Sequence, residues 1–187
     1  MSPASPSATS DSGDPYDFLA PAVKAALDSA GLVYRTMACD PDLADTAAFC
    51  AAYGFTAGQS ANTILVAGKP RAQADGTRGP VSFAACVVRA DSRLDVNKAV
   101  CRQMDVKRAS FASAGQTIEL TGMQPGGVTA FGLPPDLPVY VDKAVLDQPE
   151  VVMGGGNRSS KVILDPAELK KLPGITVVEG LAKQKEA

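Results

Sequence analysis

The segment GMQPGGVTAFGLPPDLPVYVD, residues 122–142, tells more about the architecture of this chain than any other. It joins two adjacent glycines, several prolines and an aromatic-glycine pair to the apolar run PVYVD. Glycine pairs permit positive φ and close backbone approach, and prolines stiffen the loop around them. The segment therefore predicts either a surface crossover before a strand or a rigid backbone lip over a ligand. Such loops are usually only connections, so the segment alone favours the crossover.

Outward from this segment, helical and strand patterns follow one another along the chain. Apolar residues three and four apart predict helices, and short apolar runs bounded by turn residues predict strands. The predicted helices are 16–31, 43–54, 94–106, 113–122 and 166–172. The predicted strands are 32–39, 62–68, 81–90, 138–142, 150–155, 161–165 and 175–180, the last of them closing the chain. A polar hairpin loop is predicted at 69–80, between the second and third strands.

The order and composition of these elements predict a mixed α/β fold. Strands 62–68 and 81–90 are apolar along nearly their whole length, so we expect the sheet to be covered on both faces. Strands and helices are mixed without strict βαβ alternation, which predicts a curved, mixed, barrel-like sheet flanked by helices.

Length and composition are those of an ordinary globular protein. The 187 residues are 45% hydrophobic and 20% charged, which predicts one domain, over 16–187, able to bury a sizeable core. Residues 1–15 form a Ser/Pro/Ala-rich leader that we expect to be disordered; they lack the pattern of a secretory signal. The chain has no apolar run of eighteen residues, so no transmembrane helix and no membrane partner are expected.

The chain contains no histidine, and this limits its chemistry. Ser-His-Asp and Cys-His nucleophilic schemes both need an imidazole base. The four cysteines are scattered and form no C-x-x-C pair, so we expect no zinc site, no cofactor and reduced thiols in a cytoplasmic protein. Any enzyme here must use carboxylates, a lysine, groups of the substrate or a positioned water. The net charge of −2 argues against a broad coating of nucleic acid but allows a local basic patch.

A second glycine-rich segment, MGGGNRSSK at 153–161, offers backbone N–H groups beside Arg158 and Lys161. Such a segment can hold a phosphate or a carboxylate, although a tight turn between two strands is the more common meaning. The segment fits neither the P-loop nor the dinucleotide-binding pattern.

Two further features carry weaker signals. The basic group, defined as Lys98, Arg102, Lys107 and Arg108, could contact RNA phosphates or could be a solvated helix face. Asp142 ends an apolar strand close to the glycine segments, where a carboxylate is more often a turn or cap residue than a catalyst.

Taken in order, these segments resemble the YbaK/prolyl-tRNA-editing family of aminoacyl-tRNA deacylase domains. The resemblance rests on NTILVAG at 62–68, TGMQPGGVTAFGL at 121–133 and PVYVD through PAEL at 138–169, and it covers about residues 19–183. It implies the family's mixed α/β fold and hydrolysis of the ester that joins a small amino acid, such as alanine, cysteine, serine or threonine, to tRNA. It also implies tRNA as partner, and an aminoacyl-tRNA synthetase as a possible second one.

Residue roles follow from the same resemblance. Asn62 would position the substrate, and the backbone at Gly126 and Gly127 would polarise the ester, which needs no histidine. The remaining substrate-binding residues would be Thr129, Ala130, Phe131, Asp142, Gly154, Gly155 and Gly156. The tRNA-binding residues would be the basic group together with Arg158.

Two positions depart from the family pattern. Many members have a lysine where this chain has Asn62, and many have a proline where it has Ala130. The first difference leaves two hypotheses open, a deacylase with altered specificity and a non-catalytic module that binds tRNA or an aminoacyl ligand. A small hydrolase of free esters is a third. The sequence leaves the oligomeric state open.

Overall fold

The computed structural model describes residues 18–186, so the predicted leader at 1–15 lies outside the described residues. The helices are α1 (Pro21–Ser29), α2 (Thr46–Tyr53), α3 (Cys101–Gln103), α4 (Ala114–Thr121) and α5 (Lys143–Leu146). Shorter helical turns are η1 (Pro41–Leu43), η2 (Val96–Val100) and η3 (Pro166–Lys171). The strands are β1 (Arg35–Ala38), β2 (Ala61–Lys69), β3 (Ser82–Arg89), β4 (Ser92–Leu94), β5 (Arg108–Phe111), β6 (Val139–Asp142), β7 (Val151–Gly154), β8 (Ser160–Leu164), β9 (Ile175–Val178) and β10 (Ala182–Gln184).

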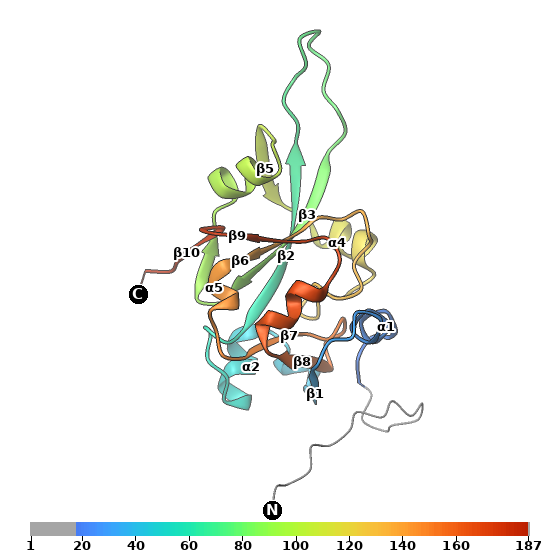
Figure 1. Cartoon of the computed structure of the whole chain (residues 1–187), viewed down its shortest axis with the longest axis vertical. Coiled ribbons are helices and arrows are strands. Elements are labelled where there is room, and N and C mark those ends of the chain that lie inside the picture. The colour runs from blue at the N-terminus through green and yellow to red at the C-terminus, as the bar shows by residue number, and fades with distance from the viewer. Residues whose placement is uncertain (1–17, 187) are drawn as a thin grey trace, which may run out of the picture.

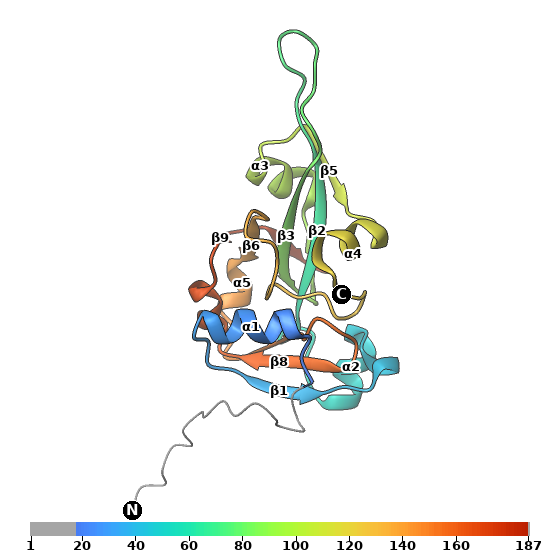
Figure 2. The same ribbon diagram turned by 90° about the vertical axis from the view of Figure 1, so that its right-hand side faces the viewer.

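The largest sheet has the order β5-β2-β3-β6-β9 and is mixed, as predicted (Figure 1). Strand β2 pairs antiparallel with β3 and β5, whereas β3–β6 and β6–β9 are parallel pairs. The connection between β2 and β3 extends away from the rest of the described chain in both views (Figures 1 and 2). Both faces of this sheet are covered, because neighbouring residues Leu65 and Val66 belong to different buried clusters.

A second sheet, β1-β8-β7, lies at the end of the molecule where β2 begins. Ser60, just before β2, forms a parallel bridge to Val152 of β7, which joins the two sheets. Helix α1 runs beside β8, and α2 lies at the end of the same sheet (Figure 2). This arrangement places the start of β2 next to the glycine segment between β7 and β8.

Three local predictions need correction. Segment 94–106 is not one α-helix but the π-helical turn η2 followed by the short α3, which ends before Asp105 at a positive φ of 51°. Segment 166–172 starts at the predicted cap, with Asp165 accepting a hydrogen bond from the Ala167 N–H, but it forms the 3-10 turn η3. Strand β9 is not the last one, because the short polar β10 follows and pairs with β4.

Within residues 18–186, no helix has the length and apolar character needed to cross a membrane.

Candidate functional site

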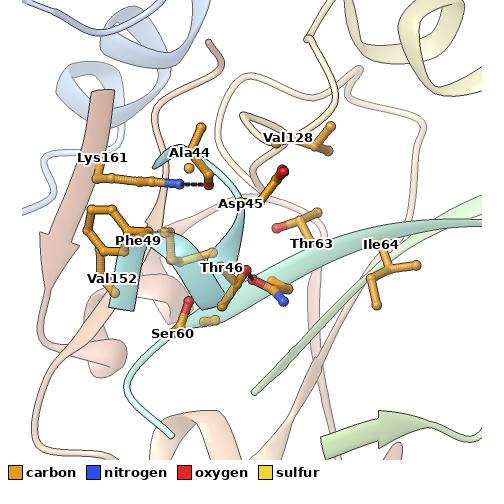
Figure 3. A pocket seen from close by; sticks show the side chains of 15 residues that line it. Ala44, Asp45, Thr46, Phe49, Ser60, Thr63, Ile64, Val128, Val152 and Lys161 are labelled. Atoms are coloured by element: carbon orange, nitrogen blue, oxygen red, sulfur yellow. Dashed lines mark hydrogen bonds between the residues drawn. The ribbon is translucent and has the colours of Figure 1, made fainter. Parts of the chain in front are cut away.

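A pocket of about 260 Å³ lies where the start of β2, α2, β7, β8 and the 122–132 segment meet (Figure 3). Its floor consists of buried residues, chiefly Ala44, Phe49, Ser60, Val152, Met153 and Lys161. Its rim consists of half-buried or exposed residues, chiefly Asp45, Thr46, Asn62, Ile64, Gly126 and Val128. The pocket therefore has a buried end and an opening lined by both polar and apolar residues.

Asn62 is the second residue of β2 and lies on the rim of the pocket. The start of α2 determines the orientation of its side-chain amide. The Thr46 hydroxyl, at the start of α2, donates a hydrogen bond of 3.0 Å to Asn62 Oδ1. With Oδ1 accepting from Thr46, the Nδ2 end remains as the donor of this amide. The geometry thus makes Asn62 an N–H donor at the pocket opening.

The two glycine segments, 122–132 and 153–161, are packed directly against each other. The Gly156 N–H donates to the Gly127 carbonyl at 2.9 Å, and a Cβ on Gly154 would lie 2.6 Å from that carbonyl oxygen. A Cβ on Gly127 would overlap the carbonyl of Asn157. Side chains at these positions would force the segments apart, so the glycines are required for this contact. Gly126 and Gly154 line the pocket, whereas the Gly127 N–H is used by the Gln124 carbonyl at 2.9 Å.

Arg158 connects three chain segments around the pocket. Its Nε and Nη2 donate to the Pro41 carbonyl at 3.1 and 2.8 Å. Its Nη1 donates to the Pro125 carbonyl at 3.0 Å and to Asp45 Oδ1 at 3.3 Å. The guanidinium, assigned to tRNA by the resemblance, is thus engaged in contacts within the protein.

Lys161 brings an amino group to the floor of the pocket. It is only 7% exposed, its Nζ donates to the Ala44 carbonyl at 2.9 Å, and Nζ lies 4.9 Å from the centroid of the Phe49 ring. Burial lowers the pKa of this amine, because the charged form loses its hydration. The sequence points to Lys161 only as a neighbour of the second glycine segment. Its place in the pocket follows from β8 lying beside α2.

Several residues expected to bind substrate do not line this pocket. Thr129, Ala130 and Phe131 are buried, the last two within the main hydrophobic cluster. Asp142 accepts hydrogen bonds from the Ala144 N–H at 2.8 Å and the Ala182 N–H at 2.7 Å, so both its carboxylate oxygens hold the fold.

Gly155 and Gly156 are also directed away from the pocket. A Cβ on Gly156 would lie 2.7 Å from Ala20 Cβ, and the Ala20 N–H donates to the Gly155 carbonyl at 2.9 Å. The two glycines thus fit the second glycine segment against the start of α1.

The basic group lies far from the pocket. All four side chains are exposed: Lys98 lies on η2, Arg102 on α3, Lys107 just before β5 and Arg108 at its start. Arg108 pairs with Lys69 at the far end of β2, and at ~3.3 Å per strand residue that position is roughly 23 Å from Asn62. The pocket and the basic group are thus at opposite ends of one strand.

Among the polar and aromatic residues that line the pocket, pattern reasoning did not point to Asp45, Thr46, Phe49, Ser60 or Thr63. Neither their types nor their spacing marks them, because they come together only when α2 packs against β2 and β8. Over residues 18–186, no group of three His, Cys, Asp or Glu side chains is placed to hold a metal ion.

Comparison with known proteins gives consistent results. The model of the aminoacyl-tRNA editing domain matches residues 40–172. The uncharacterized protein YwhH of Bacillus subtilis (strain 168) is 33% identical over 117 residues, which are 62% of this chain and 73% of YwhH.

Two solved structures are similar at 25% sequence identity, each with a TM-score of 0.71. One is the hypothetical protein APE2540, with 84% of this chain and 97% of that chain covered. The other is a protein proposed to be a trans-editing enzyme for prolyl tRNA synthetase, with 89% of this chain and 99% of that chain covered. The curved mixed fold and the family resemblance expected from the sequence are thereby confirmed. The family supports a role in tRNA editing and an interaction with tRNA, and this chain belongs to the aminoacyl-tRNA editing domain family.

Proposed function

We propose that this protein is an aminoacyl-tRNA deacylase that removes a small amino acid from mischarged tRNA. The observation that carries the proposal is the pocket itself. It gathers Asn62, Gly126 and Gly154, from three separate segments, around a space of about 260 Å³. A volume of this order suits an aminoacyl group and part of a terminal ribose better than a large ligand.

The reaction is hydrolysis of the ester between the amino acid and the ribose hydroxyl. Water adds to the carbonyl carbon, the ester C–O bond breaks, and the ribose oxygen leaves with a proton. The Asn62 Nδ2 donor, whose amide accepts a hydrogen bond from Thr46, would hydrogen-bond the oxyanion that develops on the carbonyl oxygen. The adjacent ribose hydroxyl of the substrate can carry the proton between the water and the leaving oxygen.

The tRNA would approach the polar rim with its 3′ end. The basic group, roughly 23 Å from Asn62 along β2, would contact phosphates farther along the tRNA. An aminoacyl-tRNA synthetase as second partner and a cytoplasmic location remain part of the proposal.

The test is deacylation of a panel of alanyl-, cysteinyl-, seryl- and threonyl-tRNA by the purified full chain. Each amino acid is loaded on its cognate tRNA and on proline tRNA, and the rate is compared with hydrolysis in buffer. We expect one or two members to be released well above the buffer rate, and this rate to fall in Asn62→Ala. A panel at the buffer rate throughout would contradict the deacylase.

One observation favours a second candidate, a binding module without catalysis. Asn62 carries no charge at the position where the family resemblance implies a lysine. This candidate predicts tRNA binding with no hydrolysis in the natural chain, and a gain of hydrolysis in Asn62→Lys. The deacylase predicts hydrolysis before any substitution.

A further inference from the structure

Lys161 offers hydrogen-bond donors that the protein itself does not use. An ammonium group has three N–H donors, and the described residues supply one hydrogen-bond acceptor for it, the Ala44 carbonyl. Among the described residues, no carboxylate lies within ion-pairing distance of Lys161; the nearby Asp45 carboxylate is bonded to Arg158. The Phe49 ring, 4.9 Å from Nζ, adds a cation–π contact but no oxygen or nitrogen acceptor. A buried charged group is destabilised unless it finds partners, so the remaining donors point to an acceptor brought by a ligand.

The depth of Lys161 limits which part of a ligand can reach it. A ligand attached to tRNA must enter past the rim, because the floor is closed by buried residues such as Phe49 and Val152. With the ester beside Asn62 on the rim, the group that continues toward the floor is the amino acid. Figure 3 shows Lys161, Phe49 and Val152 together at one end of the pocket, with Thr63 on the other side.

Helix α2 adds to the same electrostatic preference. Its N-cap residue Asp45 and its first residue Thr46 line the pocket, and the Asp45 side chain makes no capping hydrogen bond. An uncapped helix N-terminus presents free N–H groups and a partial positive charge. The positive end of α2 therefore adds to the preference of the Lys161 amine for an oxygen acceptor, while the Asp45 carboxylate on the rim is paired with Arg158.

We infer that the floor of the pocket selects an aminoacyl group whose side chain carries an oxygen acceptor, which receives a hydrogen bond from Lys161 Nζ. The inference rests on the proposed function and narrows its substrate class. The hydroxyl oxygen of serine or threonine accepts one of the two remaining donors, whereas alanine leaves both unpaired in a buried site. Discrimination against the analogue that lacks the oxygen is expected to be about tenfold or more, because an unpaired buried polar group is costly.

Binding of non-hydrolysable probes tests the preference of the pocket floor for an oxygen-bearing side chain without relying on catalysis. The probes are 3′-(serylamino)-3′-deoxyadenosine and 3′-(alanylamino)-3′-deoxyadenosine, which differ by one oxygen atom. Their affinities are measured by isothermal titration calorimetry for the natural chain, Lys161→Met, and the control Lys170→Met, which removes an exposed lysine.

We expect the seryl probe to bind the natural chain and Lys170→Met about tenfold or more tightly than the alanyl probe. In Lys161→Met the two probes should bind within threefold of each other, with the alanyl affinity retained. Equal affinities in the natural chain, or a seryl preference that survives in Lys161→Met, would overturn the inference. If Lys161→Met does not fold by circular dichroism, the comparison of the two probes on the natural chain still decides.

The probe-binding experiment and the tRNA deacylation panel can fail independently, so the role of Lys161 and the proposed function are tested separately. Hydrolysis in the tRNA panel together with equal probe affinities would overturn only the role of Lys161. Failure of both probes to bind, with no hydrolysis of any panel member, would overturn both proposals.

Discussion

At the scale of single residues, the Thr46–Asn62 hydrogen bond is the contact on which the proposed chemistry depends. It is 3.0 Å long and holds one end of the Asn62 amide, leaving the other end as a donor at the pocket rim. A neutral amide can stabilise an oxyanion by donation alone, so the missing lysine does not remove the means of catalysis.

Asn62→Ala should lower kcat/KM for the hydrolysed aminoacyl-tRNA by about 10²–10³, the range for loss of one oxyanion donor. Thr46→Val should cost less, because Nδ2 is still present but is no longer oriented. The measurement is steady-state deacylation kinetics, with the exposed residue substitution Asn97→Ala as control. A kcat/KM unchanged in Asn62→Ala would mean that the amide has no part in the reaction.

At the scale of elements, the pocket exists because two glycine segments meet and Arg158 holds a third segment against them. The guanidinium joins the carbonyls of Pro41 and Pro125 to the Asp45 carboxylate. Since these groups belong to η1, the 122–132 segment and the start of α2, one side chain supports both walls of the pocket.

Arg158→Met should lower the free energy of unfolding by about 1–3 kcal/mol, because two carbonyl groups lose a charged donor while the apolar stem is kept. Chemical denaturation measures the change, with Arg35→Met as the matched control. Arg35 forms an ion pair with Glu150 whose side chains are 66% and 39% exposed, so its loss should cost ~1 kcal/mol or less. Equal losses in the two variants would show that Arg158 does not stabilise the pocket walls.

At the scale of the whole molecule, the pocket and the basic group are separated along β2, which allows their roles to be tested independently. Replacing all four residues of the basic group by glutamate should weaken tRNA binding and reduce its salt dependence. Hydrolysis of a 3′-aminoacyl adenosine, too short to span roughly 23 Å, should be unchanged. Filter binding and ester kinetics measure the two effects. Unaltered tRNA affinity would identify the basic group as a solvated surface.

The interior of the main sheet also predicts how stability depends on pH. Cys86 is fully buried, and burial raises the pKa of its thiol from 9.0 to about 12. In the unfolded chain the thiol ionises near its ordinary pKa of 9.0, while the folded protein keeps it neutral. The free energy of unfolding therefore falls as pH rises from about 9 toward 12, by about 1.4 kcal/mol per pH unit from this thiol.

Denaturation at a series of pH values, for the natural chain and Cys86→Ala, measures this contribution as a difference in slope. Below pH 9 the two proteins should differ by a constant amount, set by the lost packing of the side chain. Parallel curves between pH 9 and 11 would show that the Cys86 thiol is not protected from ionisation.

Helices, strands and family were accessible from the sequence because they depend on local patterns. The apolar runs at 62–68 and 81–90 predicted β2 and β3 and their two covered faces, and the glycine segments carried the resemblance. Gly126, Gly154 and Asn62 were predicted as site residues, and all three line the pocket. The two glycines were marked by their backbone requirements, and Asn62 was marked by the family resemblance.

Other features of the site depend on contacts between distant segments. Lys161 and Phe49 are 112 positions apart, and only the packing of α2 against β8 places the amine 4.9 Å from the ring. Asp142 and Arg158 looked like ligand-binding residues, yet each bonds a backbone group distant in sequence, at Ala182 and Pro41 respectively. Local pattern determined the elements and the close approach of the glycines. The chemistry of the pocket floor was decided by tertiary structure, because burial and the partners of a charged group arise only when the chain is packed.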